Sequence, residues 1–121
     1  MSDRLEMFEE FRRRTNDRIL EHDNLQIRRF FALDERVYED GDLPATTKEL
    51  LGLVASAVLR CDDCINYHLI RCKKAGFSDA EIVEALSVAL IVGGSIVIPH
   101  LRRAVDFLDE LNLETAEEPD L

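Results

Sequence analysis

The chain has 121 residues, a length that suits one domain, and 46% of them are hydrophobic. Its 15 lysines and arginines face 25 aspartates and glutamates, so the formal charge is −10 at pH 7. Such a surface repels phosphate backbones and anionic lipids, which excludes nucleic acid and membranes as expected partners. The sequence has few glycines and prolines and few runs of β-branched residues. This scarcity favours an all-α fold, most simply a single-domain bundle of about six helices.

The first two expected helices form an N-terminal pair. Apolar residues recur at helical spacing over residues 3–20 and again over residues 24–38. The polar cluster at residues 39–44 is typical of a turn and separates this pair from the rest of the chain. We therefore divide the chain into a helical pair at 1–40, a helical domain at 41–112 and an acidic flexible tail at 113–121.

Two capping boxes indicate where later helices begin. Thr46 and Glu49 have the Thr-x-x-Glu pattern in which two side chains satisfy backbone N–H groups at a helix start. Ser78 and Glu81 repeat the pattern and predict the start of the fifth helix. The residues expected on the apolar face of the third helix are Leu50, Leu51, Val54, Ala57 and Val58.

Glycines indicate where two of these helices end. Gly76 is suited to follow the fourth helix, because glycine tolerates the left-handed backbone that often ends a helix. The pair Gly93-Gly94 is expected to end the fifth helix. Ser95 is then expected to cap the last helix, with Pro99 tolerated near its first turn.

The segment Cys61-Asp-Asp-Cys64-Ile-Asn-Tyr-His68 carries the chemistry expected of this chain. It lies at the start of the fourth helix, where its two cysteines and its histidine share one helical side. Exposed backbone N–H groups and the imidazole favour a thiolate, whereas Asp62 and Asp63 oppose it by like-charge repulsion. Two cysteines three residues apart can also close a disulfide and so store two electrons.

Glu49 joins this group if the third and fourth helices form an antiparallel hairpin. His68 then lies opposite Leu53, and Glu49 lies one helical turn further along, about 5 Å away. A carboxylate at that place can orient the imidazole and accept its proton. The alternative is that Glu49 serves only as a helix cap, as Glu81 does with no chemistry nearby.

The combined pattern resembles a known family. Glu49, Cys61, Cys64 and His68 have the E-x11-C-x2-C-x3-H spacing of alkylhydroperoxidase D-like (AhpD-like) proteins, which belong to the carboxymuconolactone decarboxylase superfamily. The resemblance extends over residues 43–108. It implies a helical fold, redox chemistry without a bound cofactor, and homo-trimers or hexamers.

The resemblance also implies a role for each site residue. In that family the second cysteine attacks the peroxide, the first closes the disulfide, and glutamate, water and histidine relay protons. Cys64 would then be peroxidatic, Cys61 resolving, His68 the base and Glu49 the relay acid. The best-known peroxidases have a second histidine just before the second cysteine, and this chain has Asp63 there, a departure that bears on peroxidase strength.

We therefore expect a thiol-dependent alkylhydroperoxide reductase or disulfide oxidoreductase. Its substrate would be an organic hydroperoxide or a disulfide, and a dithiol or a thiol reductant protein would recharge it. The N-terminus lacks the layout of a signal peptide, so the expected compartment is the cytoplasm, where cysteine pairs are redox-active more often than structural. The alternatives are a carboxymuconolactone decarboxylase-type enzyme and a non-catalytic redox-sensing oligomer. Zinc binding by the two thiolates and the imidazole ranks below redox chemistry.

The remaining reactive or charged residues have simpler interpretations. Cys72 is about 16 Å along the helix from Cys61 and is expected to be a core residue. His22 and His100 are expected to be structural or solvated. The arginine runs at 12–14 and 102–103 are expected to be solvated helix faces.

Overall fold

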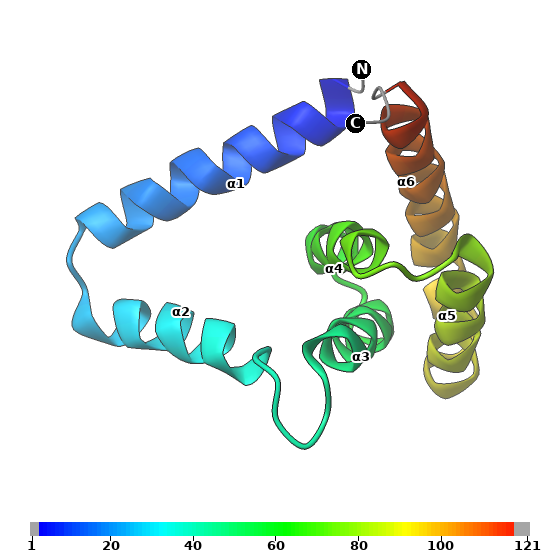
Figure 1. Ribbon diagram of the computed structural model, residues 1–121, viewed down its shortest axis with the longest axis horizontal. Helices are drawn as coiled ribbons and strands as arrows, with labels where there is room; N and C mark the ends of the chain where they lie inside the picture. Colours follow the sequence, from blue (N-terminus) through cyan, green and yellow to red (C-terminus); the bar gives the residue numbers. More distant parts are fainter. Residues whose placement is uncertain (1–2, 118–121) are drawn as a thin grey trace.

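The computed structural model describes the backbone of residues 3–117 and the side chains of residues 4–113, and all regular structure within them is helical. This confirms the all-α fold class. In chain order (Figure 1) the elements are α1 (Asp3–Glu21), α2 (Leu25–Val37), α3 (Ala45–Val58), α4 (Asp62–Lys74), α5 (Asp79–Gly93), a short 3-10 helix (Ser95–Val97) and α6 (Ile98–Glu117).

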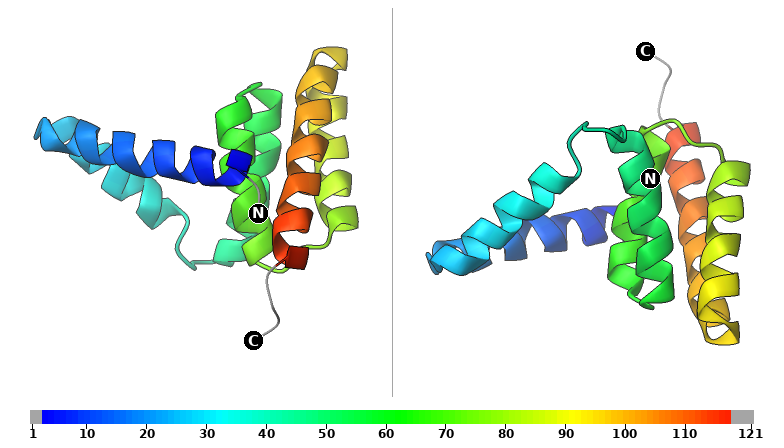
Figure 2. Two further views of the ribbon diagram at one scale, coloured as in Figure 1. Left: turned by 90° about the horizontal axis from the view of Figure 1, so that it is seen from above. Right: turned by 90° about the horizontal axis from the view of Figure 1, so that it is seen from below.

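Four helices form two layers that enclose the core. Helix α3 packs against both α4 and α5, and α4 packs against α6. Figure 2 shows α3 and α4 side by side in one layer, with α5 and α6 in the other. The turn between α3 and α4 is tight, and Arg60 adopts a left-handed backbone there with φ of 61°. The two helices therefore run antiparallel, as the hairpin hypothesis required.

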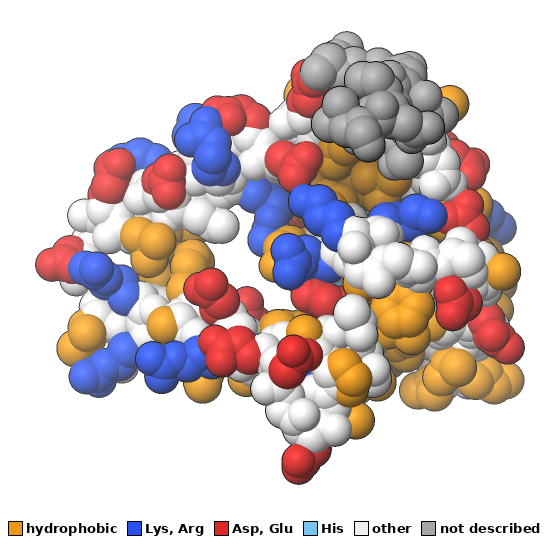
Figure 3. Space-filling model, in the orientation of Figure 1, with side chains coloured by type: hydrophobic (Ala, Val, Ile, Leu, Met, Phe, Trp, Pro, Cys, Tyr) orange, Lys and Arg blue, Asp and Glu red, His pale blue; other side chains and the backbone are white. Residues whose placement is uncertain are grey.

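Only the first turns of the N-terminal pair pack against this core, and the rest of the pair projects from it. Helix α1 reaches α6 near its own start, where Arg4 pairs with Asp106 at 2.7 Å and the rings of Phe8 and Phe107 lie 5.8 Å apart. Helix α2 buries no residue, and its Phe30 side chain is 69% exposed. Figure 3 shows apolar side chains on the surface of α2.

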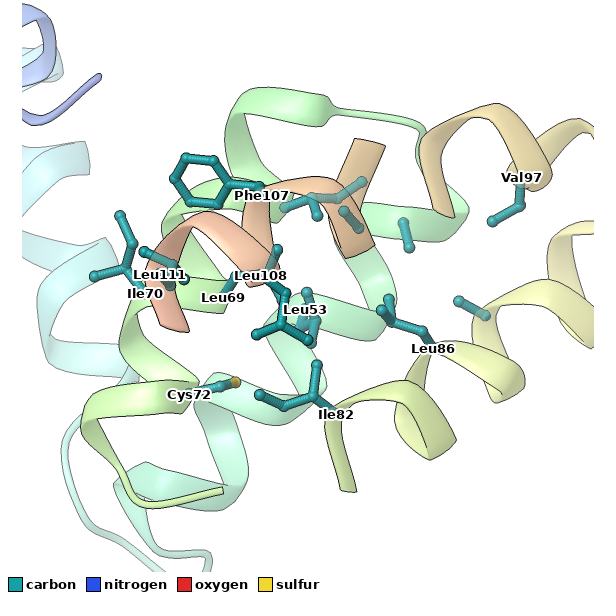
Figure 4. Packing of buried hydrophobic residues seen from close by; sticks show 14 residues of the cluster. Leu53, Leu69, Ile70, Cys72, Ile82, Leu86, Val97, Phe107, Leu108 and Leu111 are labelled. Carbon is teal, nitrogen blue, oxygen red and sulfur yellow. The ribbon is translucent and has the colours of Figure 1, made fainter. Parts of the chain in front are cut away.

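The core consists of side chains from α3 to α6 (Figure 4). Leu53, Leu69 and Phe107 are completely buried, and burying each such side chain stabilises the fold by roughly 1.5–3 kcal/mol. Leu51, which we expected on the inner face of α3, is 53% exposed. The expectation was wrong because α3 turns Leu53 and Ala57 inward, and Leu51 then lies on the opposite side of the helix.

Helix α3 begins differently from the prediction. Its first residue is Ala45, and the N-cap position is Pro44, which has an extended backbone and makes no side-chain cap bond. Asp40 accepts the N–H of Ala45 at 2.7 Å and so satisfies a donor that the helix leaves free. The prediction of a Thr46–Glu49 capping box was therefore wrong, because Thr46 is already the second residue of the helix.

The second box and the glycine ends are confirmed. Ser78 accepts the N–H of Glu81 at 3.1 Å, and the Glu81 carboxylate accepts the N–H of Ser78 at 2.8 Å. Gly76 and Gly94 follow α4 and α5 with φ of 95° and 83°, values that favour glycine.

The last helix starts later and runs longer than expected. Ser95 does not cap it, because a 3-10 turn intervenes and α6 begins at Ile98. The segment expected to form a flexible tail from residue 113 is helical as far as Glu117, and residues 118–121 lie outside the described part of the chain. No helix within the described residues is long and apolar enough to cross a bilayer.

Candidate functional site

Cys61 and Cys64 form a disulfide at the start of α4. Cys61 is the N-cap residue, and its sulfur accepts the N–H of Cys64 at 3.2 Å. Cys64 is exposed and Cys61 is half-buried, whereas Cys72 is buried and free. The pair therefore lies at the free N–H groups of a helix start, which favour a thiolate when the disulfide opens.

Glu49 and His68 are in direct contact inside the protein. The Oε1 atom of Glu49 lies 3.0 Å from Nδ1 of His68, and the two residues are only 6% and 8% exposed. The expected approach of these residues across the α3–α4 hairpin is therefore confirmed. Arg71 adds a longer contact, with its Nε 3.4 Å from the second carboxylate oxygen of Glu49. Glu49 is thus a buried partner of the imidazole and takes no part in a helix cap.

Tyr38 lies on the other side of the imidazole. Its hydroxyl is 3.4 Å from Nε2 of His68, and the two rings are 5.4 Å apart. A carboxylate only accepts hydrogen bonds, so the contact with Glu49 selects the tautomer with the proton on Nδ1, and Nε2 is then left to accept from Tyr38. Burial raises the pKa of Tyr38, with nearby Asp34 and Glu49 adding to the effect, so the phenol keeps its proton to donate.

Sequence reasoning missed Tyr38, because it ends a helix 30 residues before His68. It also missed Gly52, which has no side chain and so lets the His68 ring and the Tyr38 hydroxyl lie close to α3. A Cβ atom at Gly52 would lie 2.6 Å from Cε1 of His68 and 2.8 Å from the Tyr38 hydroxyl. The available signal was a glycine in the middle of a predicted helix, where it weakens the helix and so indicates a close approach.

The two aspartates between the cysteines each have cationic or basic partners. Asp62 contacts Nδ1 of His100 at 2.7 Å and Arg103 at 3.2 Å. Asp63 lies 3.4 Å from Arg12. The expected repulsion between these carboxylates and a thiolate is therefore weakened. Arg12 and Arg103 are not simple solvated residues, and His100 has a structural contact, as expected.

The cysteine sulfurs make no hydrogen bond with His68 among the described residues. Both ring nitrogens of His68 face other partners, Nδ1 toward Glu49 and Nε2 toward Tyr38. His68 nevertheless lies one helical turn after Cys64 on the same helix. A proton passing between the thiol and the imidazole must therefore travel through a water molecule or follow a change of side-chain rotamer.

Cys72 is separate from this group. Burial raises the pKa of its thiol to about 12, with a further contribution from the charge on Glu49. It is therefore a neutral core residue at physiological pH, as expected. Within the described residues, no three or more His, Cys, Asp or Glu side chains gather in a way that could hold a metal ion.

Comparison with known proteins gives the following similarities. Residues 27–107 match the Carboxymuconolactone decarboxylase family. An uncharacterized protein of the cox locus of Paracoccus denitrificans is 31% identical over 83 residues, which are 69% of this chain and 75% of that protein.

Two crystal structures of one Thermotoga maritima protein share the fold. The first has a TM-score of 0.90 and 59% identity, and it covers 93% of this chain and 98% of its own. The second has a TM-score of 0.86 and 57% identity, and it covers 95% and 99%. That protein is described as a carboxymuconolactone decarboxylase family member for which a part in the antioxidative response has been suggested.

Proposed function

Because this chain belongs to the carboxymuconolactone decarboxylase family, we propose that it is a thiol-dependent oxidoreductase that reduces organic hydroperoxides or disulfides. One observation carries the proposal. The Cys61–Cys64 disulfide lies at the start of α4, and His68 on the next turn of this helix is in buried contact with Glu49. The antioxidative role suggested for the Thermotoga maritima relative agrees with this chemistry.

The proposed cycle starts from the reduced pair. The Cys64 thiolate attacks an oxygen of the hydroperoxide, the O–O bond breaks, and one proton converts the leaving alkoxide to an alcohol. Cys64 is then a sulfenic acid. The Cys61 thiol attacks its sulfur, water leaves, and the disulfide forms. A dithiol donor restores both thiols and is itself oxidised to a disulfide, so two electrons pass from donor to peroxide in each cycle.

His68 and Glu49 would move the protons in this cycle. The imidazole can take the Cys64 proton through water and later return it to the alkoxide, which is general acid–base catalysis. The Glu49 carboxylate balances the positive charge that forms on the ring. It also holds Nδ1, so Nε2 is the nitrogen that takes up and returns the proton.

Exposure supports the assignment of Cys64 as the attacking residue. A hydroperoxide must reach the attacking sulfur from solvent, and Cys64 is exposed whereas Cys61 is half-buried. One further observation supports activation of Cys64 once the pair is reduced. The carboxylate of the adjacent Asp63 lies 3.4 Å from Arg12, which weakens its repulsion of a thiolate. The helix start itself favours a thiolate on Cys61, because the N–H of Cys64 donates to the Cys61 sulfur.

Mutation of the two cysteines tests the proposal. Reduced wild type should consume an alkyl hydroperoxide in the presence of a dithiol, and Cys64→Ser should abolish this consumption. Cys61→Ser should retain a sulfenic acid on Cys64 that dimedone traps. Cys72→Ser is the matched control and should behave as wild type, because Cys72 is buried away from the pair. Reversible disulfide formation without turnover would instead indicate a redox sensor.

The proposal includes self-association and a cytoplasmic setting in which dithiols are abundant. Apolar side chains are exposed along α2 and near the C-terminal end of α5. They support a homo-oligomer, either a trimer or a hexamer. Monomeric proteins rarely leave such contiguous apolar surface in water. The side chains concerned are Ile27, Phe30, Leu33, Val37, Val88, Ile91 and Val92.

A further inference from the structure

A cavity of about 270 Å³ lies between α1 and α4. Its walls combine cations with apolar surface. Four of its nine lining residues are Arg or Lys and one is acidic, in a chain that has 25 acidic residues and 15 basic ones. Figure 3 shows Lys and Arg side chains beside the hollow between these helices. The lining cations are Arg12, Arg13, Arg71 and Lys74.

The cations of this cavity differ in how far they are already neutralised. Arg13 pairs with Glu10 on the exposed face of α1 and lies 3.9 Å from Asp17, so a bound acid competes there with exposed carboxylates. Lys74 forms no ion pair with any described residue. The guanidinium of Arg12 lies over the ring of Tyr67, 4.4 Å from its centroid, and its contact with Asp63 is long at 3.4 Å. A guanidinium that rests on a ring loses little conformational freedom when it binds a carboxylate. Its planar pair of N–H donors can bond both carboxylate oxygens.

The cavity adjoins the proposed catalytic group. Tyr67 in its wall also packs edge-on against His68, with 5.2 Å between ring centroids. Arg71 in the same wall contacts Glu49 at 3.4 Å. A ligand in the cavity therefore lies one side chain away from the proton relay.

The cavity also lies along the face of α4 that carries the exposed residue Cys64. Cys64, Tyr67, Arg71 and Lys74 are spaced by three, four and three residues, so they share one face of α4. The rise of an α-helix places Arg71 and Lys74 about 10 to 15 Å along the axis from Cys64. Ile70, Phe8 and Tyr67 supply apolar wall for the intervening part of a ligand.

From these observations we infer that the cavity binds the carboxylate end of an amphipathic organic acid, whose apolar chain runs along α4 toward Cys64. If the chain acts as the hydroperoxide reductase proposed above, its preferred substrate is a hydroperoxide that carries a carboxylate, such as a fatty acid hydroperoxide. This assignment rests on the proposed function, whereas the binding of the acid does not.

Calorimetry with octanoate tests the cavity without any catalytic step. The oxidised protein should bind octanoate. It should not bind methyl octanoate or acetate over the same range of ligand concentration. Arg13→Gln/Lys74→Gln should weaken octanoate binding about tenfold or more, the scale of a lost charge-assisted contact. Arg29→Gln/Arg102→Gln makes the same change of charge outside the cavity and should bind as wild type. Equal binding by both double variants, or none by wild type, would overturn the inference.

Turnover then tests the substrate class. With a dithiol donor, wild type should reduce linoleic acid hydroperoxide with a higher kcat/KM than its methyl ester. Arg13→Gln/Lys74→Gln should remove that preference and leave reduction of tert-butyl hydroperoxide unchanged. Equal kcat/KM for acid and ester in wild type would overturn the substrate assignment. Failure to reduce any hydroperoxide would instead overturn the proposed function, and octanoate binding would still decide the cavity.

Discussion

Gly52 lies directly against the imidazole of His68, so close that a methyl group on its Cα would stand 2.6 Å from Cε1. Glu49 holds Nδ1, the ring atom next to Cε1, at 3.0 Å, so any movement of the imidazole away from α3 would stretch this contact. The absence of a side chain at one position of α3 therefore allows α4 to present its histidine to both Glu49 and Tyr38.

Gly52→Ala should destabilise the protein by about 1–3 kcal/mol, the usual cost of overpacking. It should also displace His68 and so slow the alkylation of reduced Cys64. Urea unfolding and alkylation rates measure the two effects. Gly41→Ala is the control, since a Cβ there would meet only the flexible end of Lys48 at 3.5 Å. An alanine at position 52 that leaves both quantities unchanged would contradict the tight contact.

Glu49→Gln should lower peroxide turnover roughly 10²-fold, the scale of a lost general acid–base partner. The glutamine oxygen can still accept from Nδ1 of His68, but no negative charge then balances the protonated ring. Cys64 alkylation should accordingly require higher pH. Glu81→Gln changes a carboxylate that only caps α5, and it should cost at most about 1 kcal/mol of stability with no effect on the thiol. Overlapping pH profiles for wild type and Glu49→Gln would remove Glu49 from the relay.

Tyr38→Phe removes the hydroxyl that faces Nε2 of His68. We expect a shift in the pH profile of turnover, because the imidazole loses the donor that orients its exchanging nitrogen. The stability cost should be no more than about 1.5 kcal/mol, since the contact is long. Tyr67→Phe keeps the ring that packs on His68 and should leave the profile unchanged. Identical profiles for all three proteins would limit Tyr38 to packing.

The thiol of Cys72 should make the fold sensitive to alkali. Its pKa is raised from 9.0 to about 12 in the folded protein, so the unfolded chain loses this proton first as pH rises. The stabilisation that Cys72 contributes is therefore complete below pH 9 and falls between pH 9 and 12. The loss should be about 1.4 kcal/mol per pH unit.

Urea unfolding at several pH values measures this effect against Cys72→Ala. Both proteins should carry Cys61→Ser and Cys64→Ser so that no disulfide exchange intervenes. The difference in unfolding free energy between them should shrink above pH 9. Parallel curves up to pH 11 would show that the thiol ionises freely.

The proposed oligomer predicts a role for the apolar face of α2. Phe30→Glu places a charge on that face, where the native side chain is 69% exposed, so folding of one chain should change little. Light scattering should show wild type as a trimer or hexamer and Phe30→Glu as a smaller species. Arg29→Glu, on an exposed position of the same helix, should assemble as wild type. A wild-type monomer at micromolar concentration would contradict self-association.

Local sequence determined the helices and several of their ends. The Ser78–Glu81 capping box and the glycines at 76 and 94 act within one helical turn, so they could be predicted without knowledge of the packing. The Cys61–Cys64 pairing was predictable for the same reason, because residues three apart at a helix start are always neighbours. The catalytic roles assigned to these residues stay predictions.

The tertiary structure decided between the two interpretations of Glu49, as a helix cap or as a partner of His68. The Thr-x-x-Glu pattern predicted a cap, but Pro44 and Asp40 start α3 two residues earlier, and the hairpin then places the carboxylate on His68. Tyr38 could not be predicted at all. Its contact with His68 joins residues 30 apart in sequence, and such contacts depend on how helices pack and on the space left at Gly52. Patterns within one helix do not record that packing.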